Sequence, residues 1–185
     1  MQKRNNFFIL AGAQSTGKTS VLLELKKQNQ ITIDEAARRV IVNQRRSGDN
    51  ATADYDKQSY CILQHQTMLN DYLTHLTTKE NIFFDRGLPD SIFTEKAING
   101  KVRNQTLIDI EEHRYNHHVF LFPPWIKCYQ KDDIRPGDFN QSIETHHHII
   151  SAYKQADYEL ITMPTVSVIQ RVQFILNRIP SFLQH

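Results

Sequence analysis

One segment near the N-terminus has glycine, lysine and threonine at the spacing of a phosphate-binding loop. It runs Gly12-Ala13-Gln14-Ser15-Thr16-Gly17-Lys18-Thr19, and Ser20 follows it. Glycine at both ends lets the backbone wrap around a diphosphate, so that successive N–H groups face its negative charge. Lys18 is placed to reach the terminal phosphates, and the Thr19 hydroxyl is placed to bind Mg²⁺. The alternative interpretation is an ordinary surface turn rich in glycine and hydroxyl residues.

The residues on either side of this segment favour the phosphate-binding interpretation. An apolar run over 7–11 predicts a buried strand before it, and residues 20–27 predict a helix after it. A strand, the loop and then a helix is the context that the motif requires. The N-terminus of that helix would add to the attraction for phosphate.

Acidic residues end two more predicted strands. Residues 31–33 are followed by Asp34 and Glu35, and residues 81–85 end at Asp85 itself. An acid at the position of Asp85 can hold Mg²⁺ directly or through water. Asp34 or Glu35 could accept the proton of an acceptor hydroxyl during phosphoryl transfer, and Asp85 is an alternative acceptor of that proton. The alternatives are structural, because Asp85 could cap the following turn and either of the other two acids could be the N-cap of the next helix.

Two arginines follow these acids. Arg86 carries a planar guanidinium that can hold a phosphoryl group through two hydrogen bonds. Arg38 lies three residues beyond Glu35, on the same side of a predicted helix, so it can point towards the same substrate. As an alternative, Arg38 is a solvated helix charge.

The segment 125–140 carries cations at four-residue steps, at Lys127, Lys131 and Arg135. On a helix they would share one face and could close as a lid over a bound triphosphate. A charged surface hairpin is the alternative. Trp125 could stack on a base or a substrate ring, although a single tryptophan is more often a packing residue.

The order of the predicted elements indicates how these residues meet. The predicted strands cover 7–11, 31–33, 81–85, 118–122 and 158–163, and the predicted helices cover 20–27, 36–46, 54–78, 90–97, 104–115, 140–155 and a last stretch from 167. This alternation predicts a three-layer α/β/α domain around a five-stranded parallel sheet. Ligands of such sheets bind beyond the carboxyl ends of the strands. Gly12, Glu35, Asp85 and Pro123 should therefore surround one crevice.

Length and composition set further expectations. The chain of 185 residues predicts a single domain, 1–185, and its net charge of +2 gives no sign of a nucleic-acid partner. Cys61 and Cys128 lack metal-type spacing and are expected to be reduced thiols. The first predicted strand leaves no room for a secretory signal, and no apolar run approaches the ~20 residues of a membrane span. We expect a soluble cytoplasmic protein, monomeric or a small homo-oligomer.

Taken together, the motifs resemble those of a group of small bacterial P-loop proteins catalogued as AAA-type ATPases. Their layout is similar to nucleoside and nucleotide kinases, including the ribosylnicotinamide kinase domain. The resemblance covers nearly the whole chain. It rests on Gly12 to Thr19, Asp34-Glu35-Ala36-Ala37-Arg38, Phe84-Asp85-Arg86-Gly87-Leu88-Pro89-Asp90, Phe122-Pro123-Pro124-Trp125, the stretch 133–135 and Arg171-Val172-Gln173-Phe174-Ile175-Leu176.

The resemblance implies roles for particular residues. Glu35 with Arg38 resembles the Glu-x-x-Arg of ribosylnicotinamide kinases, in which the acid faces the substrate hydroxyl, and this favours Glu35 over Asp34. Asp85-Arg86 resembles the Asp-Arg pair of thymidylate-type and deoxynucleoside kinases. Arg135 resembles a lid arginine. Pro164 and Thr165 fall where related kinases contact adenine.

The function implied by the resemblance is an ATP- and Mg²⁺-dependent kinase of a small molecule, such as a nucleoside, a nucleotide or a related metabolite. The chain lacks a guanine signature, which favours ATP over GTP. It is too short for the small helical domain of AAA machines and lacks their ring-forming arginine motif. An ATP-hydrolysing regulatory switch is the main alternative. A nucleotide-sensing module without turnover is a third.

Overall fold

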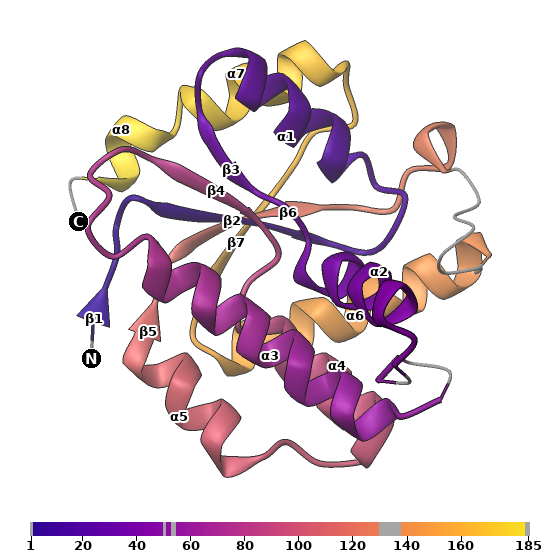
Figure 1. The fold of residues 1–185 in the computed structure, drawn as a ribbon. Helices are drawn as coiled ribbons and strands as arrows, with labels where there is room; N and C mark the ends of the chain where they lie inside the picture. The colour runs from indigo at the N-terminus through magenta and orange to yellow at the C-terminus, as the bar shows by residue number, and fades with distance from the viewer. Residues whose placement is uncertain (1, 50, 53–54, 130–137, 184–185) are drawn as a thin grey trace.

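The computed structural model describes residues 2–49, 51–52, 55–129 and 138–183 (Figure 1). Five parallel strands form its main sheet, and their spatial order is β3 (Ile31–Ile33), β4 (Ile82–Asp85), β2 (Phe7–Gly12), β6 (His118–Phe122) and β7 (Glu159–Thr162). Helices cover both faces of the sheet (Figure 1). The predicted three-layer α/β/α architecture with a five-stranded parallel sheet is confirmed.

The central strand, β2, is buried at every position, and the alternation of its side chains builds two cores. Phe8 and Leu10 face the layer formed by α1 (Lys18–Lys27), α7 (Val168–Leu176) and α8 (Ile179–Phe182). Phe7 and Ile9 face the opposite layer, formed by α3 (Lys57–Thr74), α4 (Asp90–Asn99), α5 (Asn104–Glu112) and α6 (Phe139–Gln155). A strand buried on both faces reads as a continuous apolar run, which is what residues 7–11 show.

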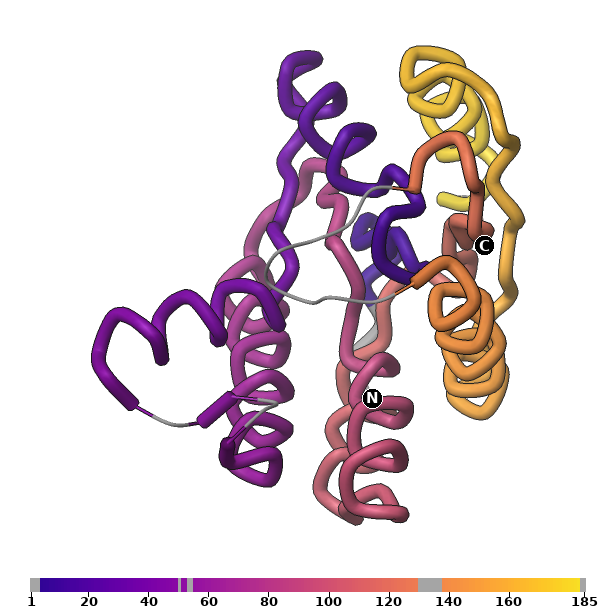
Figure 2. The backbone as a smooth tube through the Cα atoms, turned by 90° about the vertical axis from the view of Figure 1, so that its right-hand side faces the viewer, coloured from indigo at the N-terminus to yellow at the C-terminus, as the bar shows by residue number. Residues whose placement is uncertain are grey.

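Helix α2 (Ala36–Ser47) contributes most of its buried residues to a third cluster, outside the two main cores. Its apolar residues Val40 and Ile41 pack with Tyr60 of α3 in a smaller separate cluster. Figure 2 shows α2 projecting away from the sheet beside α3. The first turn of α2 nevertheless lies directly after β3, at the carboxyl end of the sheet, and this is what brings residues 34–38 to the site.

The structure differs from the predicted elements at several boundaries. The predicted helix 54–78 is shorter and begins after Asp56, whose side chain accepts the N–H of Ser59. The predicted helix 104–115 ends at Glu112, because His113–Arg114 form β5, which pairs in parallel with β1 (Gln2–Lys3). A short 3₁₀ helix, η1 (Ile126–Cys128), follows β6.

The start of α7 and the end of α4 carry recognisable capping residues. Ser167 and Gln170 form a capping box at the start of α7. Gly100 ends α4 in the left-handed conformation.

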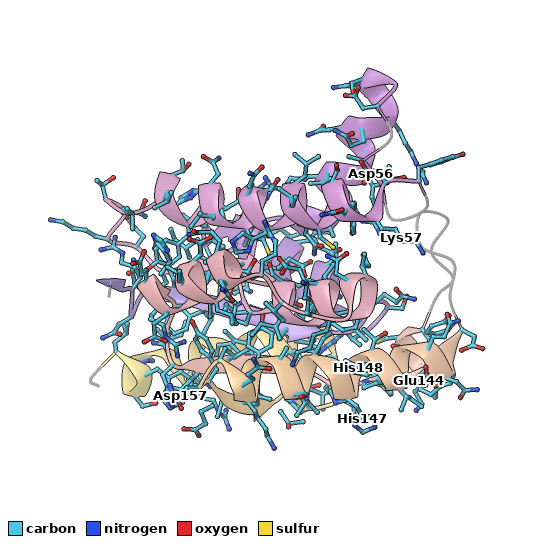
Figure 3. The ribbon with its side chains drawn as sticks, turned by 90° about the horizontal axis from the view of Figure 1, so that it is seen from below. Asp56, Lys57, Glu144, His147, His148 and Asp157 are labelled. Carbon is cyan, nitrogen blue, oxygen red and sulfur yellow. The ribbon has the colours of Figure 1, made fainter. Side chains whose placement is uncertain are left out.

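Three consecutive histidines lie on α6, which is seen from below in Figure 3. His147 and His148 lie on different sides of the helix (Figure 3). The ring of His148 stacks on Phe93 of α4, with their centroids 5.7 Å apart. Consecutive helical residues diverge in this way because each advances by about 100° around the axis. Among the described residues, no helix is long and apolar enough to cross a bilayer.

Candidate phosphate-binding site

The loop between β2 and α1 depends on glycine at both ends. Gly12 has φ +147°, and a Cβ atom there would lie 2.7 Å from the backbone oxygen of Phe122. Gly17 has φ +86°, which L side chains rarely adopt. Ser15, between them, also has a positive φ. The loop can therefore pass this close to β6 only without a side chain at position 12.

Lys18 reaches back across this loop. Its Nζ donates to the carbonyl oxygens of Gly12 and Ala13, at 3.0 and 2.8 Å, and the side chain is buried. The Thr16 hydroxyl also donates to the Ala13 oxygen, at 3.0 Å. These bonds hold the curvature of the loop, with α1 beginning immediately after Gly17. The amides and the Lys18 ammonium form a compact region of positive potential at a helix N-terminus.

Asp85 ends β4 beside this loop, as predicted. It is 7% exposed, and within the described part of the chain its Oδ1 has no hydrogen-bond partner. Burial raises the pKa of Asp85 to about 6. Lys18 and Arg86 lower that pKa, whereas Glu35 and Asp90 raise it. A buried carboxylate oxygen without a donor suits a cation. The Thr19 hydroxyl lines the same cavity, so Thr19 and Asp85 together fit Mg²⁺.

Glu35 is fixed by an ion pair with Arg86. Its Oε1 accepts from Arg86 Nε at 2.9 Å, and both side chains are largely buried. Glu35 precedes α2 at the N-cap position, yet its side chain makes no capping hydrogen bond. The structural alternative, a helix cap, therefore does not hold for Glu35. Asp34, by contrast, is exposed.

Arg86 is the centre of a larger buried network. Its Nη1 donates to Asp90 Oδ1 at 2.7 Å, and Asp90 Oδ2 accepts from the Gly87 amide and from the hydroxyl of Tyr153 on α6. Burial lowers the pKa of Arg86, but the carboxylates of Asp90, Glu35 and Asp85 outweigh this and raise it. The guanidinium is thus permanently charged and held between two acids. Its predicted contact with a phosphoryl group stays a prediction.

Sequence reasoning did not assign Asp90 and Tyr153 to the site. Asp90 lies in the same motif as Arg86, four residues later, and its place in that motif is the signal that could have found it. Tyr153 comes from another helix, and nothing local in the sequence connects it to Asp90.

Arg171 is a third residue that sequence reasoning did not assign to the site. It is 3% exposed, it donates from Nη1 to the Thr16 carbonyl at 3.2 Å, and its guanidinium lies 5.6 Å from the ring centre of Trp125. A cation at this distance from an indole is attracted to the ring face. Arg171 therefore joins the phosphate loop to Trp125, so the tryptophan lies on the α7 side of the loop.

The remaining predicted residues lie as follows. Arg38 is exposed and lines the same cavity as Thr19 and Asp85. Pro164 and Thr165 follow the end of β7. Arg135 and Lys131 lie outside the described residues, so the predicted lid is described only at 125–129 and 138–140.

Two cavities meet at Glu35. The larger, about 650 Å³, lies between α1 and α2 and contains Thr19, Asp85 and Arg38 in its lining. The smaller, about 210 Å³, is lined by residues of α2, α3, α4 and α6, together with Gln14 of the loop and Arg86. Glu35 borders both, so it stands between the predicted metal site and a second cavity.

A glycine-rich loop between the central parallel strand and a helix, with acids at the ends of two neighbouring strands, defines a P-loop α/β protein. The profile of a family described as "AAA domain" matches residues 7–171, and the chain belongs to this family. No curated protein sequence matches the chain.

Two solved structures are similar in fold. One is the NadR protein in complex with NR, with a TM-score of 0.64 and 14% identity. The match covers 96% of this chain and 50% of the NadR chain, so the present chain spans half the length of that protein. The other is shikimate kinase from Acinetobacter baumannii in complex with shikimate, with a TM-score of 0.57, 15% identity and coverage of 95% and 93%. At these identities the likeness concerns the fold.

Proposed function

We propose that the chain is an ATP- and Mg²⁺-dependent kinase that phosphorylates a hydroxyl group of a small molecule. The observation that carries this proposal is the position of Glu35. It is held by Arg86 next to Asp85 and borders a second cavity, which Thr19 does not line. A simple hydrolase needs water at this position, whereas a kinase needs a cavity for an acceptor.

Different residues of the chain have different roles in phosphoryl transfer. The loop amides of 12–17 and Lys18 bind the β- and γ-phosphates. Thr19 and Asp85 would hold Mg²⁺, which neutralises charge on the phosphates when bound. Glu35 accepts the proton of the acceptor hydroxyl. At the same time the hydroxyl oxygen forms a bond to the γ-phosphorus, and the bond from that phosphorus to the β-phosphate oxygen breaks. Arg86 fixes the direction of the Glu35 carboxylate.

The nucleotide base is assigned to the α7 side of the loop. Trp125, backed by Arg171, offers an aromatic face, and Pro164 and Thr165 stand after the next strand along. Arg135 is proposed as a lid cation. We place the acceptor among nucleosides, nucleotides and related metabolites because the motifs resemble those of ribosylnicotinamide and deoxynucleoside kinases.

Three broader expectations accompany this function. The chain 1–185 acts as one domain, as a monomer or small homo-oligomer, with no nucleic acid or membrane as partner. A reducing cytoplasm suits its thiols, since Cys61 and Cys128 are both free. Burial raises the pKa of Cys61 to about 11, which keeps that thiol unreactive.

An ATP-hydrolysing regulatory switch is the second candidate. The AAA description of the family favours it. The two candidates share the loop and the metal ligands and differ in whether an acceptor hydroxyl or water receives the phosphoryl group.

A metabolite screen with two neighbouring variants separates these candidates. The protein is incubated with ATP, Mg²⁺ and pooled nucleosides and nucleotides, and mass spectrometry follows new phosphorylated species. Glu35→Gln should lower product formation about 10²- to 10⁴-fold, the usual contribution of a general base. Asp34→Asn, one residue away and exposed, is the matched control and should retain activity.

Steady hydrolysis of ATP without any phosphorylated acceptor would contradict the kinase proposal and support the switch. A loss of product in Asp34→Asn, with Glu35→Gln unaffected, would move the role of base to the neighbouring acid.

A further inference from the structure

The geometry points to the smaller cavity as the acceptor site, and to an acceptor that carries an N–H donor in addition to its reacting hydroxyl. This inference rests on the proposed kinase function and adds the position and chemical class of the substrate. The side-chain carbonyl of Gln64 on α3 would accept the hydrogen bond from this donor.

Gln64 is a buried polar residue whose carbonyl lacks a donor. Its side chain is 5% exposed, lines the smaller cavity, and its Oε1 has no hydrogen-bond partner among the described residues. The next residue, His65, is by contrast fully engaged, with Ser91 at 2.9 Å and Asp109 at 2.7 Å. Buried polar atoms in folded proteins are nearly always partnered. The partner of Gln64 Oε1 is therefore a group that enters the cavity.

The register of α3 against α4 locates Gln64 within the cavity. Cys61 lies opposite Thr94, and His65 lies opposite Ser91, so the two helices run antiparallel. Gln64 is consequently level with the first turn of α4, about 3 Å along the axis beyond Asp90. Asp90 accepts from Arg86, and Arg86 donates to Glu35, so Gln64 and the proposed base border the same cavity beside this network.

The remaining lining suits a ring. Tyr60 and Phe93 contribute aromatic surface, and Ala97 and Ile98 contribute apolar surface further along α4. Small-molecule sites typically combine apolar and aromatic walls with a few converging polar groups. Here these polar groups are the Glu35 carboxylate at one side and the Gln64 carbonyl. A cyclic hydroxyl compound with an amide or amino N–H matches both.

The larger cavity fits an acceptor less well. Its unpartnered carboxylate oxygen belongs to Asp85 and is accounted for by Mg²⁺. Arg39, in its lining, is already paired with Asp71 of α3.

Calorimetry on two variants of the full chain tests the inference. The probes are nicotinamide riboside and cytidine, which carry N–H donors, and shikimate, which does not. Each is titrated with a non-hydrolysable ATP analogue and Mg²⁺ present. Gln64→Leu removes the carbonyl and keeps the volume, and Gln66→Leu makes the same change two residues away on the exposed side of α3.

We expect at least one of the N–H probes to bind, and to bind more tightly than shikimate. Gln64→Leu should weaken that binding about tenfold, the worth of one buried hydrogen bond, while Gln66→Leu should leave it unchanged. The ligand-free Gln64→Leu protein should melt at the same temperature as the wild type or higher, because it no longer buries an unpartnered carbonyl. Binding of the ATP analogue should be the same in all three proteins.

Unchanged binding in Gln64→Leu, a lowered melting temperature of that ligand-free variant, binding of shikimate alone, or no binding of either N–H probe would each overturn the inference. Failure of the kinase proposal gives a different result. In that case the probe binds and depends on Gln64, yet no phosphorylated probe forms when ATP replaces the analogue.

Discussion

The Glu35 carboxylate is positioned by a chain of charged and polar groups that begins on α6. Tyr153 donates to Asp90, Asp90 accepts from Arg86, and Arg86 donates to Glu35. Arg86 has φ +72°, a conformation rare for a residue with a side chain, and its buried guanidinium is neutralised by the two acids. We infer that this strained arrangement is maintained because it orients the proposed base.

Two substitutions distinguish the contribution of charge from that of hydrogen bonding in the network of Tyr153, Asp90, Arg86 and Glu35. Asp90→Asn leaves Arg86 with one acid fewer and should lower the free energy of unfolding by about 3–5 kcal/mol, as breaking a buried ion pair does. Tyr153→Phe keeps the charges of Arg86 and Asp90 and removes one hydrogen-bond donor, so it should lower the free energy of unfolding by about 1 kcal/mol. Urea unfolding of both proteins measures the difference. Equal losses would show that the charges in this network contribute no more than one neutral hydrogen bond.

At the scale of elements, the phosphate loop is constrained by β6 as much as by its own sequence. Gly12 passes so close to the Phe122 carbonyl that a methyl group would collide with backbone, and backbone cannot turn aside as a flexible side chain can. Gly48, the C-cap of α2, also has a positive φ, of +76°, but nothing lies within 4 Å of a Cβ added there. The two glycines therefore separate steric contact from backbone strain.

Gly12→Ala and Gly48→Ala form a matched pair on this basis. Gly48→Ala should cost about 1–2 kcal/mol of stability, the strain of a left-handed residue, and leave nucleotide binding unchanged. Gly12→Ala should cost more and should also weaken nucleotide binding, because the loop must shift away from β6. Thermal unfolding and calorimetry with ATP measure both effects. Similar results for the two variants would contradict a steric role for Gly12.

Helices α4 and α5 are joined by one buried acid, and this gives a pH-dependent prediction. Glu95 accepts from the Arg103 amide at 2.7 Å, from the Arg103 guanidinium and from the Thr106 hydroxyl at 2.6 Å. Burial raises the pKa of Glu95, but these hydrogen bonds and the Arg103 charge outweigh it and lower the pKa below its ordinary value of 4.5. The ionised form is therefore the one that stabilises the fold.

The stability given by Glu95 should be complete above pH 4.5 and should be lost as the pH falls through the lowered pKa. Glu95→Gln should thus lower the free energy of unfolding by about 2 kcal/mol at pH 7, and the difference from wild type should shrink in acid. Glu112→Gln, at an exposed position of α5, is the control. Denaturant unfolding at several pH values measures this, and a difference that grew in acid would contradict the assignment.

The sequence was sufficient to predict the elements that carry strong periodicity and the residues at strand ends. Gly12, Glu35 and Asp85 lie at one edge of the sheet because parallel strands with helical crossovers must bring their carboxyl ends together. The short pairing of β1 with β5 could not be predicted, because two residues show no alternation. Contacts such as Arg171 with Thr16, or Tyr153 with Asp90, depend on how helices dock and leave no local signal.

For the molecule as a whole, the two cores explain why one edge of the sheet is free for ligands. Helices cover both faces and β2 is buried at the centre. The chain passes from β2 to β3 on one side of it and later crosses from β4 to β6 on the other side. The loop after β2 lies where the crossover connections change direction. The layer of α1 and α7 is on one side of it, and the layer of α3, α4 and α6 is on the other. We propose that the nucleotide and the acceptor approach Glu35 from these two layers.

The fate of the γ-phosphoryl group tests this account most directly. The protein is mixed with ATP, Mg²⁺ and the acceptor found by the metabolite screen in ¹⁸O-labelled water, and the phosphate products are analysed by mass spectrometry, with Lys18→Ala as the inactive reference. The account predicts phosphorylated acceptor without ¹⁸O from the water and no more than background labelled inorganic phosphate, both absent in Lys18→Ala. Labelled inorganic phosphate as the main product, with the acceptor unchanged, would contradict it.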